Sequence, residues 1–204
     1  MYSTRTGLVL AFHGCDQSIV EDVLIGNAVL KNSKNAYDWL GNGIYFWDNS
    51  PARASEFATS LSKRLNAKNK IVTPAVIGAV INLGFCLDLL DYKNLILVRD
   101  AYNLLATTCK ALGVAIPVNT KPRDSKDLLI RDLDCAVFET LHQFRKQHKM
   151  LPFDSVRGVF WEGDELYPNS GFREKDHIQI CIRNPNCIKG YFTPVRLNKK
   201  FTKI

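Results

Sequence analysis

The sequence predicts an α+β fold built as a single domain over residues 1–204. Strand-like segments begin and end the chain and two long helical segments lie between them, an order typical of α+β proteins. The composition, 46% hydrophobic and 23% charged, is that of an ordinary globular protein. No linker rich in proline or serine divides the chain, so one domain is expected.

In the first half, short strands and helices are expected to alternate. The apolar run Leu8–Phe12 predicts an opening strand, and apolar residues at helical spacing predict a helix over Gln17–Ile25. A glycine turn within 40–47 leads into a short aromatic strand. Because the cap residue Ser50 precedes a proline, a helix is expected to begin there and to continue to about Leu65.

In the second half, the apolar run Ala75–Leu83 predicts a buried strand. Helical spacing predicts two helices, Asp91–Leu112 and Ser125 to about Lys149, which together form a helical insert at about 91–149. Three strand-like segments are expected to close the chain: Ser155–Trp161, His177–Arg183 and Cys187–Phe192.

The chain is basic, with a net charge of +7 at pH 7 and a pI near 9.1. A basic surface favours an acidic partner: nucleic acid, a phosphate-rich cofactor or an acidic protein. If the basic clusters surround a cleft, they would attract phosphate backbones, and binding would weaken steeply as salt rises. The clusters comprise Lys63, Arg64, Lys68 and Lys70; Arg145, Lys146, His148 and Lys149; and Arg196, Lys199, Lys200 and Lys203.

Several kinds of protein are not expected. The longest apolar runs fall short of the roughly 20 residues that a membrane-spanning helix needs, and the N-terminal residues lack the length and cleavage site of a signal peptide. We therefore expect a cytoplasmic protein with no membrane partner. The six cysteines include no closely spaced pair, so no metal site is expected.

Two short motifs suggest a specific chemistry. The first is Phe12-His13-Gly14, a histidine at the end of a strand followed directly by glycine. The second is Gly41-Asn-Gly-Ile-Tyr-Phe46, which precedes a helix with small residues and an aromatic one. Together they resemble the NAD-binding half of ADP-ribosyltransferases of the poly(ADP-ribose) polymerase and diphtheria-toxin type. The resemblance is carried by residues 8–60 and implies a split β-sheet core, to which the helical insert has no counterpart.

The resemblance implies roles for five residues. His13 would hydrogen-bond a ribose hydroxyl of NAD, and Gly14 would present its backbone to the nicotinamide carboxamide, since a residue without a side chain lets the ring come close. Tyr45 would stack on the nicotinamide ring, with Phe57 on its other side. Ala54 is small enough to leave room for the ring.

The third signature residue of this family is a glutamate or another polar residue on a late strand. Gln179, Asp176 and Glu174 are the candidates here. Gln179 is favoured because strand alternation sets it opposite a row of isoleucines; Asp176 is the strongest alternative. A carboxylate could accept a proton from the acceptor, whereas a glutamine amide can orient groups but cannot act as a base at neutral pH. His177 and Glu162 are candidate helpers.

The resemblance implies an NAD-dependent mono-ADP-ribosyltransferase that modifies a macromolecule. The absence of an assured glutamate argues for transfer of one ADP-ribose. The charge places RNA or DNA slightly ahead of protein as the acceptor. Such an enzyme could be a bacterial toxin held by an antitoxin protein, or a defence effector. Two alternatives stay open: an NAD glycohydrolase, and a non-catalytic module that binds ADP-ribose or nucleic acid.

Overall fold

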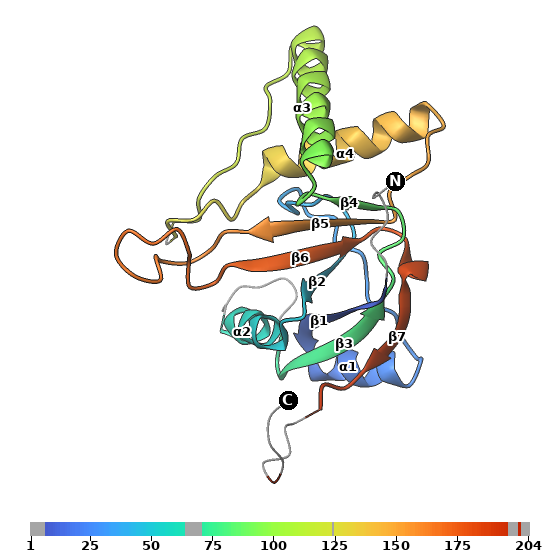
Figure 1. The fold of residues 1–204 in the computed structure, drawn as a ribbon, viewed down its shortest axis with the longest axis vertical. Coiled ribbons are helices and arrows are strands. Elements are labelled where there is room, and N and C mark those ends of the chain that lie inside the picture. Colours follow the sequence, from blue (N-terminus) through green and yellow to red (C-terminus); the bar gives the residue numbers. More distant parts are fainter. Residues whose placement is uncertain (1–6, 64–70, 124, 196–199, 201–204) are drawn as a thin grey trace.

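A computed structural model describes residues 7–63, 71–123, 125–195 and 200. It contains one seven-stranded sheet with helices, which confirms the α+β class (Figure 1). The elements in chain order are β1 (Val9–Asp16), α1 (Gln17–Leu24), β2 (Ile44–Asp48), α2 (Pro51–Ser62), β3 (Pro74–Ile81), β4 (Cys86–Asp88), α3 (Tyr92–Leu112), α4 (Asp132–Gln147), β5 (Ser155–Phe160), β6 (His177–Ile182), a 3₁₀ turn (Pro185–Cys187) and β7 (Ile188–Phe192).

The sheet has the strand order β4-β5-β6-β2-β1-β3-β7. Only β4 and β5 run parallel; the other neighbours are antiparallel. Strand β1 pairs with β3 along its whole length but with β2 at two positions, Ala11 opposite Asp48 and Phe12 opposite Trp47. Beyond Phe12 the two central strands therefore separate, and the sheet is divided into two halves that meet at this short junction.

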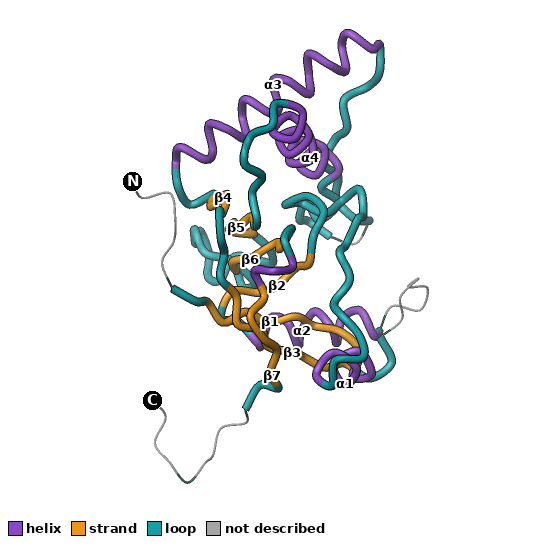
Figure 2. The backbone as a smooth tube through the Cα atoms, turned by 90° about the vertical axis from the view of Figure 1, so that its right-hand side faces the viewer, coloured by secondary structure: helices purple, strands orange, loops and turns teal. Residues whose placement is uncertain are grey.

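The helices lie at two ends of the molecule. Helices α3 and α4 pack together beyond β4, whereas α1 and α2 lie beside β1 and β3 (Figures 1 and 2). Alternation along β1 places α1 and α2 on opposite faces: Cys15 joins Val20 of α1 in the main core, while Gly14 contacts α2. A second core lies between α3, α4 and the β5–β6 half of the sheet, around Leu87, Val137, Phe138 and Val156.

Local capping explains most helix boundaries. The side chains of Asp16, Ser50 and Asp91 accept hydrogen bonds from the first turns of α1, α2 and α3, and Gly113 ends α3 with a φ of +66°.

The predicted start of the last long helix was wrong. Helix α4 begins at Asp132 instead of Ser125, because Thr120 and Ile130 pair as an isolated antiparallel bridge that keeps the chain extended before the helix. Its cap comes from Asn119, whose side-chain oxygen accepts hydrogen bonds from the N–H groups of Leu133 and Asp134. In the described residues, no helix is both long and apolar enough to cross a membrane.

Candidate functional site

The two sequence motifs meet where β1 and β2 separate. His13 lies on β1, half-buried, and its ring contacts that of Phe46 on β2 at 5.8 Å between centroids. Its Nδ1 lies 2.7 Å from the carbonyl oxygen of Tyr45. The structure thus brings the His-Gly and Gly-Ile-Tyr-Phe motifs into direct contact.

That contact decides the chemistry of the His13 ring. A carbonyl oxygen can only accept, so Nδ1 must carry the proton and donate it. Burial lowers the pKa of His13 below its usual 6.5, although the hydrogen bond to Tyr45 opposes this shift, so the imidazole is neutral at pH 7. Its Nε2 is then an acceptor, suited to a hydroxyl donor.

Gly14 is required by the approach of α2. A Cβ atom at this position would lie 2.1 Å from the carbonyl oxygen of Ala54 and 3.2 Å from the Cβ of Ala58. Both alanines are fully buried. Small residues on both sides therefore let the start of α2 reach the backbone of β1.

The hydroxyl of Tyr45 anchors the preceding turn. It donates to the carbonyl oxygen of Gly41 (2.7 Å) and accepts from the N–H of Leu40 (3.0 Å). Burial raises the pKa of Tyr45 far above its usual value, with the negative charge of Asp38 adding to the shift. The phenol is therefore neutral and structural at its hydroxyl end, and only its ring is left for stacking.

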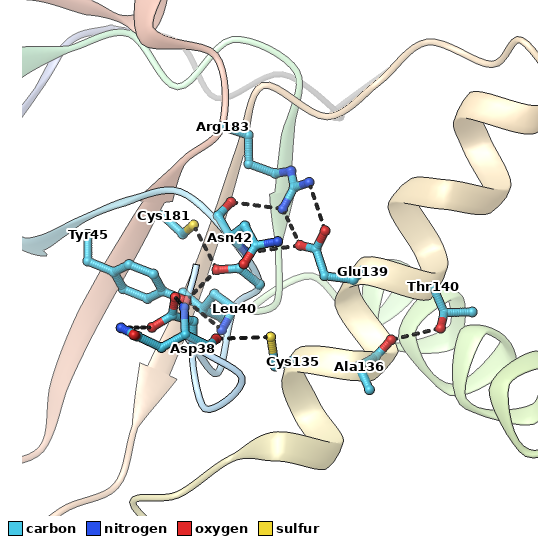
Figure 3. A network of polar contacts seen from close by, with 12 residues as sticks. Asp38, Leu40, Asn42, Tyr45, Cys135, Ala136, Glu139, Thr140, Cys181 and Arg183 are labelled. Atoms are coloured by element: carbon cyan, nitrogen blue, oxygen red, sulfur yellow. Dashed lines mark hydrogen bonds and ion pairs between the residues drawn. The ribbon is translucent and has the colours of Figure 1, made fainter. Parts of the chain in front are cut away.

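An ion pair between α4 and the residue after β6 holds the same turn through hydrogen bonds to Asn42 (Figure 3). Glu139 accepts from the N–H of Asn42 (2.9 Å) and pairs with Arg183 at 2.6 Å. Burial alone would raise the pKa of Glu139, but the bonds from Arg183 and Asn42 outweigh it and hold that pKa below its usual value. Helix α4 and β6 thus fix the turn that carries Tyr45.

An unpredicted row of aromatic rings crosses the sheet from α2 toward α4. The ring of Phe57 lies 4.9 Å from Trp47, and Trp47 lies 6.1 Å from His177. The row continues from His177 to Phe160 (5.5 Å) and from Phe160 to Trp39 (4.9 Å). The Phe57 ring packs against Trp47 at a tilt of 48°, whereas Tyr45 packs in the α4 core.

Gln179 lies beneath this row. Its side-chain oxygen accepts from the indole N–H of Trp39 at 2.6 Å; since that N–H can only donate, the amide NH₂ group must point the other way. Phe12, Trp47 and Gln179 are cross-strand partners and share one face of the sheet.

The other candidates for the third signature residue lie elsewhere. Asp176 precedes β6, and its Oδ2 accepts from the N–H of Arg173 at 2.9 Å. Glu174 is exposed in the loop. Alternation places His13 on the opposite face from Gln179, so the imidazole and the amide would reach a ligand from the two sides of the junction.

The loop 161–176 is tied to its surroundings by ion pairs. Glu162 pairs with Arg53 of α2 at 2.8 Å, and Lys175 pairs with Glu56 of α2 at 2.9 Å. On the other side, Asp127 accepts from the N–H of Gly163 at 2.8 Å. The loop therefore connects α2 to the segment that precedes α4.

The basic cluster that the structure describes in full, at residues 145–149, does not lie at this site. Arg145 is buried, donates twice to the carbonyl oxygen of Leu151 and stacks on Phe153, so it is not a surface charge. Its neighbours in the sequence lie at the far end of α4 from α2 (Figure 1). Most of the other two clusters lies outside the described residues: Arg64, Lys68, Lys70, Arg196, Lys199 and Lys203.

Comparison of the chain with protein-family models, curated proteins and solved structures finds no match. Within the described residues, no three His, Cys, Asp or Glu side chains form a group that could hold a metal ion. All six cysteines are buried and form no disulfide within the described residues.

Proposed function

We propose that the protein is an NAD-dependent mono-ADP-ribosyltransferase that modifies a macromolecule. As the acceptor of ADP-ribose, we favour nucleic acid slightly over protein. The observation that supports this best is the junction of β1 and β2. There a neutral histidine with an acceptor nitrogen lies beside a close-packed glycine on β1, and its ring contacts the backbone carbonyl of Tyr45 on β2. The strand that carries Gln179 lies directly beside them.

Each residue of the site has a separate role in the proposed reaction. Nicotinamide leaves the ribose with the electrons of the glycosidic bond, the acceptor's lone pair forms the new bond to the anomeric carbon, and the acceptor loses a proton. His13 Nε2 accepts from a ribose hydroxyl and holds the sugar, and the backbone of Gly14 holds the carboxamide. The Gln179 amide, fixed by Trp39, orients the ribose and cannot take the proton. Asp176 is the nearest candidate for that base.

The test uses NAD labelled in its ADP-ribose part, with purified RNA, DNA and a protein extract as acceptors. Label on RNA or DNA that nuclease releases supports the proposal in full, and label that protease releases keeps the transferase but moves its target to protein. Free ADP-ribose in every reaction identifies a glycohydrolase instead, and unchanged NAD refutes both enzymes.

Variants test the assignment of residues. His13→Phe keeps a ring against Phe46 but removes the acceptor, and it should lower NAD turnover at least about tenfold. Gln179→Ala should lower both transfer and any background NAD hydrolysis, and by more than Asp176→Ala does. Wild-type turnover in the His13 and Gln179 variants would refute the site.

A further inference from the structure

A second site lies beside the junction, at the end of the sheet nearest the loop 161–176. It is a cavity of about 570 Å³, within the range of about 300–1,000 Å³ that small-molecule sites occupy. The residues that give it its chemistry are Asp48, Ser50, Trp161, Phe172, Asp176 and His177. Two segments that are far apart in sequence therefore line it: the end of β2 with the residues after it, and the stretch 159–178, which runs from the end of β5 through the loop to the start of β6.

Buried polar atoms without partners gather around this cavity. In the described part of the chain, five buried side-chain nitrogen or oxygen atoms lack a hydrogen bond. Two of them, Asp176 Oδ1 and His177 Nε2, belong to residues that line the cavity. Trp47, whose ring lies 6.1 Å from His177, and Arg53 each carry a further such atom, although neither residue belongs to the lining. Since an unpaired buried polar group is costly, the two atoms of the lining are the ones that a bound ligand could satisfy.

The hydrogen-bonding character of these atoms can be assigned. His177 Nδ1 lies 2.6 Å from the carbonyl oxygen of Lys175 and must donate to it. Burial lowers the pKa of His177 to about 4, so the ring is neutral and Nε2 is an acceptor. Asp176 Oδ1 is also an acceptor, whereas Trp47 Nε1 and Arg53 Nε can only donate. The carboxylate of Asp48, held by Arg157 at 2.9 Å, adds further acceptors.

The walls of the cavity favour a flat ligand. Trp161 and Phe172 are 58% and 64% exposed, although both belong to the cavity lining. The guanidinium of Arg173 lies 5.5 Å from the Trp161 ring and supports it. Exposed aromatic rings are the platforms on which unpaired nucleic-acid bases stack.

The charge of the lining separates the candidate ligands. Two carboxylates, Asp48 and Asp176, repel a phosphate group, so the backbone of a nucleic acid is not the part that enters. A guanidinium would also satisfy the acceptors of the lining, so argininamide is the competitor that tests this alternative. A nucleobase with an amino group offers N–H donors and ring acceptors on one edge, together with a face for stacking.

We propose that this cavity binds an amino-bearing nucleobase, which is flipped out of a single-stranded nucleic acid and stacked against Trp161 and Phe172. The role of this cavity as the acceptor site of a transferase rests on the proposed function. The binding itself needs no NAD, so the two proposals can fail separately. In a transferase, the base amine would face Asp176, which supplies the proton acceptor that Gln179 cannot.

The test is calorimetric titration of the whole chain, without NAD, with cytidine and with uridine. These two nucleosides differ only in the amino or oxo group at C4 and in the protonation of N3. Cytidine should bind at least about fivefold more tightly than uridine, because only it offers an amine to the carboxylates. Equal affinities, or no binding of cytidine, guanosine or adenosine, would overturn the proposal, whatever the labelled-NAD assay shows.

Variants connect the binding to the cavity. Asp176→Asn should weaken cytidine binding at least about tenfold, and Trp161→Ala should weaken it at least about fivefold; the exposed ring of Trp161 can be removed without unfolding the chain. Asp164→Asn, on the same loop but outside the cavity lining, is the matched control. Unchanged binding in both test variants, or displacement of cytidine by argininamide at equal concentration, would refute the proposal, and the latter would point to a protein side chain.

Discussion

Because Gly14 has no side chain, helix α2 can approach strand β1 closely. In Gly14→Ala the new Cβ would lie 2.1 Å from the Ala54 carbonyl oxygen, a backbone atom that cannot move alone. We expect the helix to shift, with a loss of about 2–4 kcal/mol in the free energy of unfolding and a loss of NAD turnover. Urea unfolding measures the first effect. Gly190→Ala, on β7 with open space around it, is the control and should change stability by less than about 1 kcal/mol.

Two histidines, the half-buried His142 and the buried His177, should make stability depend on pH. Burial lowers the pKa of both His142 and His177 to about 4, and Arg183 and Arg145 reinforce the shift of His142 while Glu139 opposes it. In the unfolded chain both rings titrate near 6.5. The folded state therefore binds fewer protons between these values, so its stability is complete above pH 6.5 and falls as the pH drops toward 4.

The variant His142→Leu removes one of these groups and keeps an apolar contact with Phe153. Its free energy of unfolding should fall less between pH 7 and pH 4.5 than that of the wild type. Urea titrations at pH 7, 5.5 and 4.5 make the comparison. The same loss in both proteins would show that His142 does not titrate with unfolding.

At the scale of elements, the turn 38–43 is held by bonds to three separate parts of the chain. The hydroxyl of Tyr45 on β2 forms hydrogen bonds with the backbone of the turn at two points. Glu139 of α4 accepts from the N–H of Asn42, and Arg183 after β6 donates to the Asn42 carbonyl oxygen at 2.9 Å. Tyr45→Phe keeps the ring but leaves the N–H of Leu40 without its partner.

We therefore expect Tyr45→Phe to lower the free energy of unfolding by about 1–3 kcal/mol. The affinity for NAD should fall much less, because the variant retains the ring and the backbone carbonyl that holds His13. Chemical denaturation and NAD titration of the same preparation separate the two effects. A wild-type stability would mean that the hydroxyl does not anchor the turn.

The elements that the sequence predicts well are those with a strong local signal. Strand Ile44–Asp48 and helix Tyr92–Leu112 follow from apolar spacing and from caps that lie next to them in the chain. The predicted start of α4 was wrong because the residue that caps this helix, Asn119, lies many residues earlier in the sequence. Strand β4 was not predicted, since three residues carry too little periodicity.

The same distinction applies to the site. His13, Gly14 and Tyr45 carry a readable motif, and the fold places them together. The aromatic row was not predicted, because Trp39, Trp47 and Phe160 become neighbours only when β2, β5 and β6 pair. The cavity depends likewise on the loop 161–176 closing back on α2, for which ion pairs between distant residues are the cause.

At the scale of the whole molecule, charge is distributed unevenly. The loop 161–176 and the cavity beside it are rich in carboxylates, while Lys146 and Lys149 lie at the far end of α4 (Figure 1). The segment before α4 carries the exposed cations Lys121, Arg123 and Lys126, and Lys126 pairs with Asp164 of the loop at 3.5 Å. We therefore expect the phosphates of a single strand whose base enters the cavity to meet Lys121 and Arg123, and not the end of α4.

This placement predicts which cations set the salt dependence of binding. The double variant Lys121→Ala/Arg123→Ala should weaken binding of a single-stranded oligonucleotide at low salt. It should also reduce the magnitude of the slope of log K against log salt by about 1.4, since each lost phosphate contact removes about 0.7. Fluorescence anisotropy with a labelled oligonucleotide across a salt series gives both values. Lys146→Ala/Lys149→Ala removes the same charge from the other end of the molecule and should leave the slope unchanged. If instead the α4 variant lowers the slope and the first does not, the nucleic acid lies across α4, and the cavity beside the loop 161–176 is not where it binds.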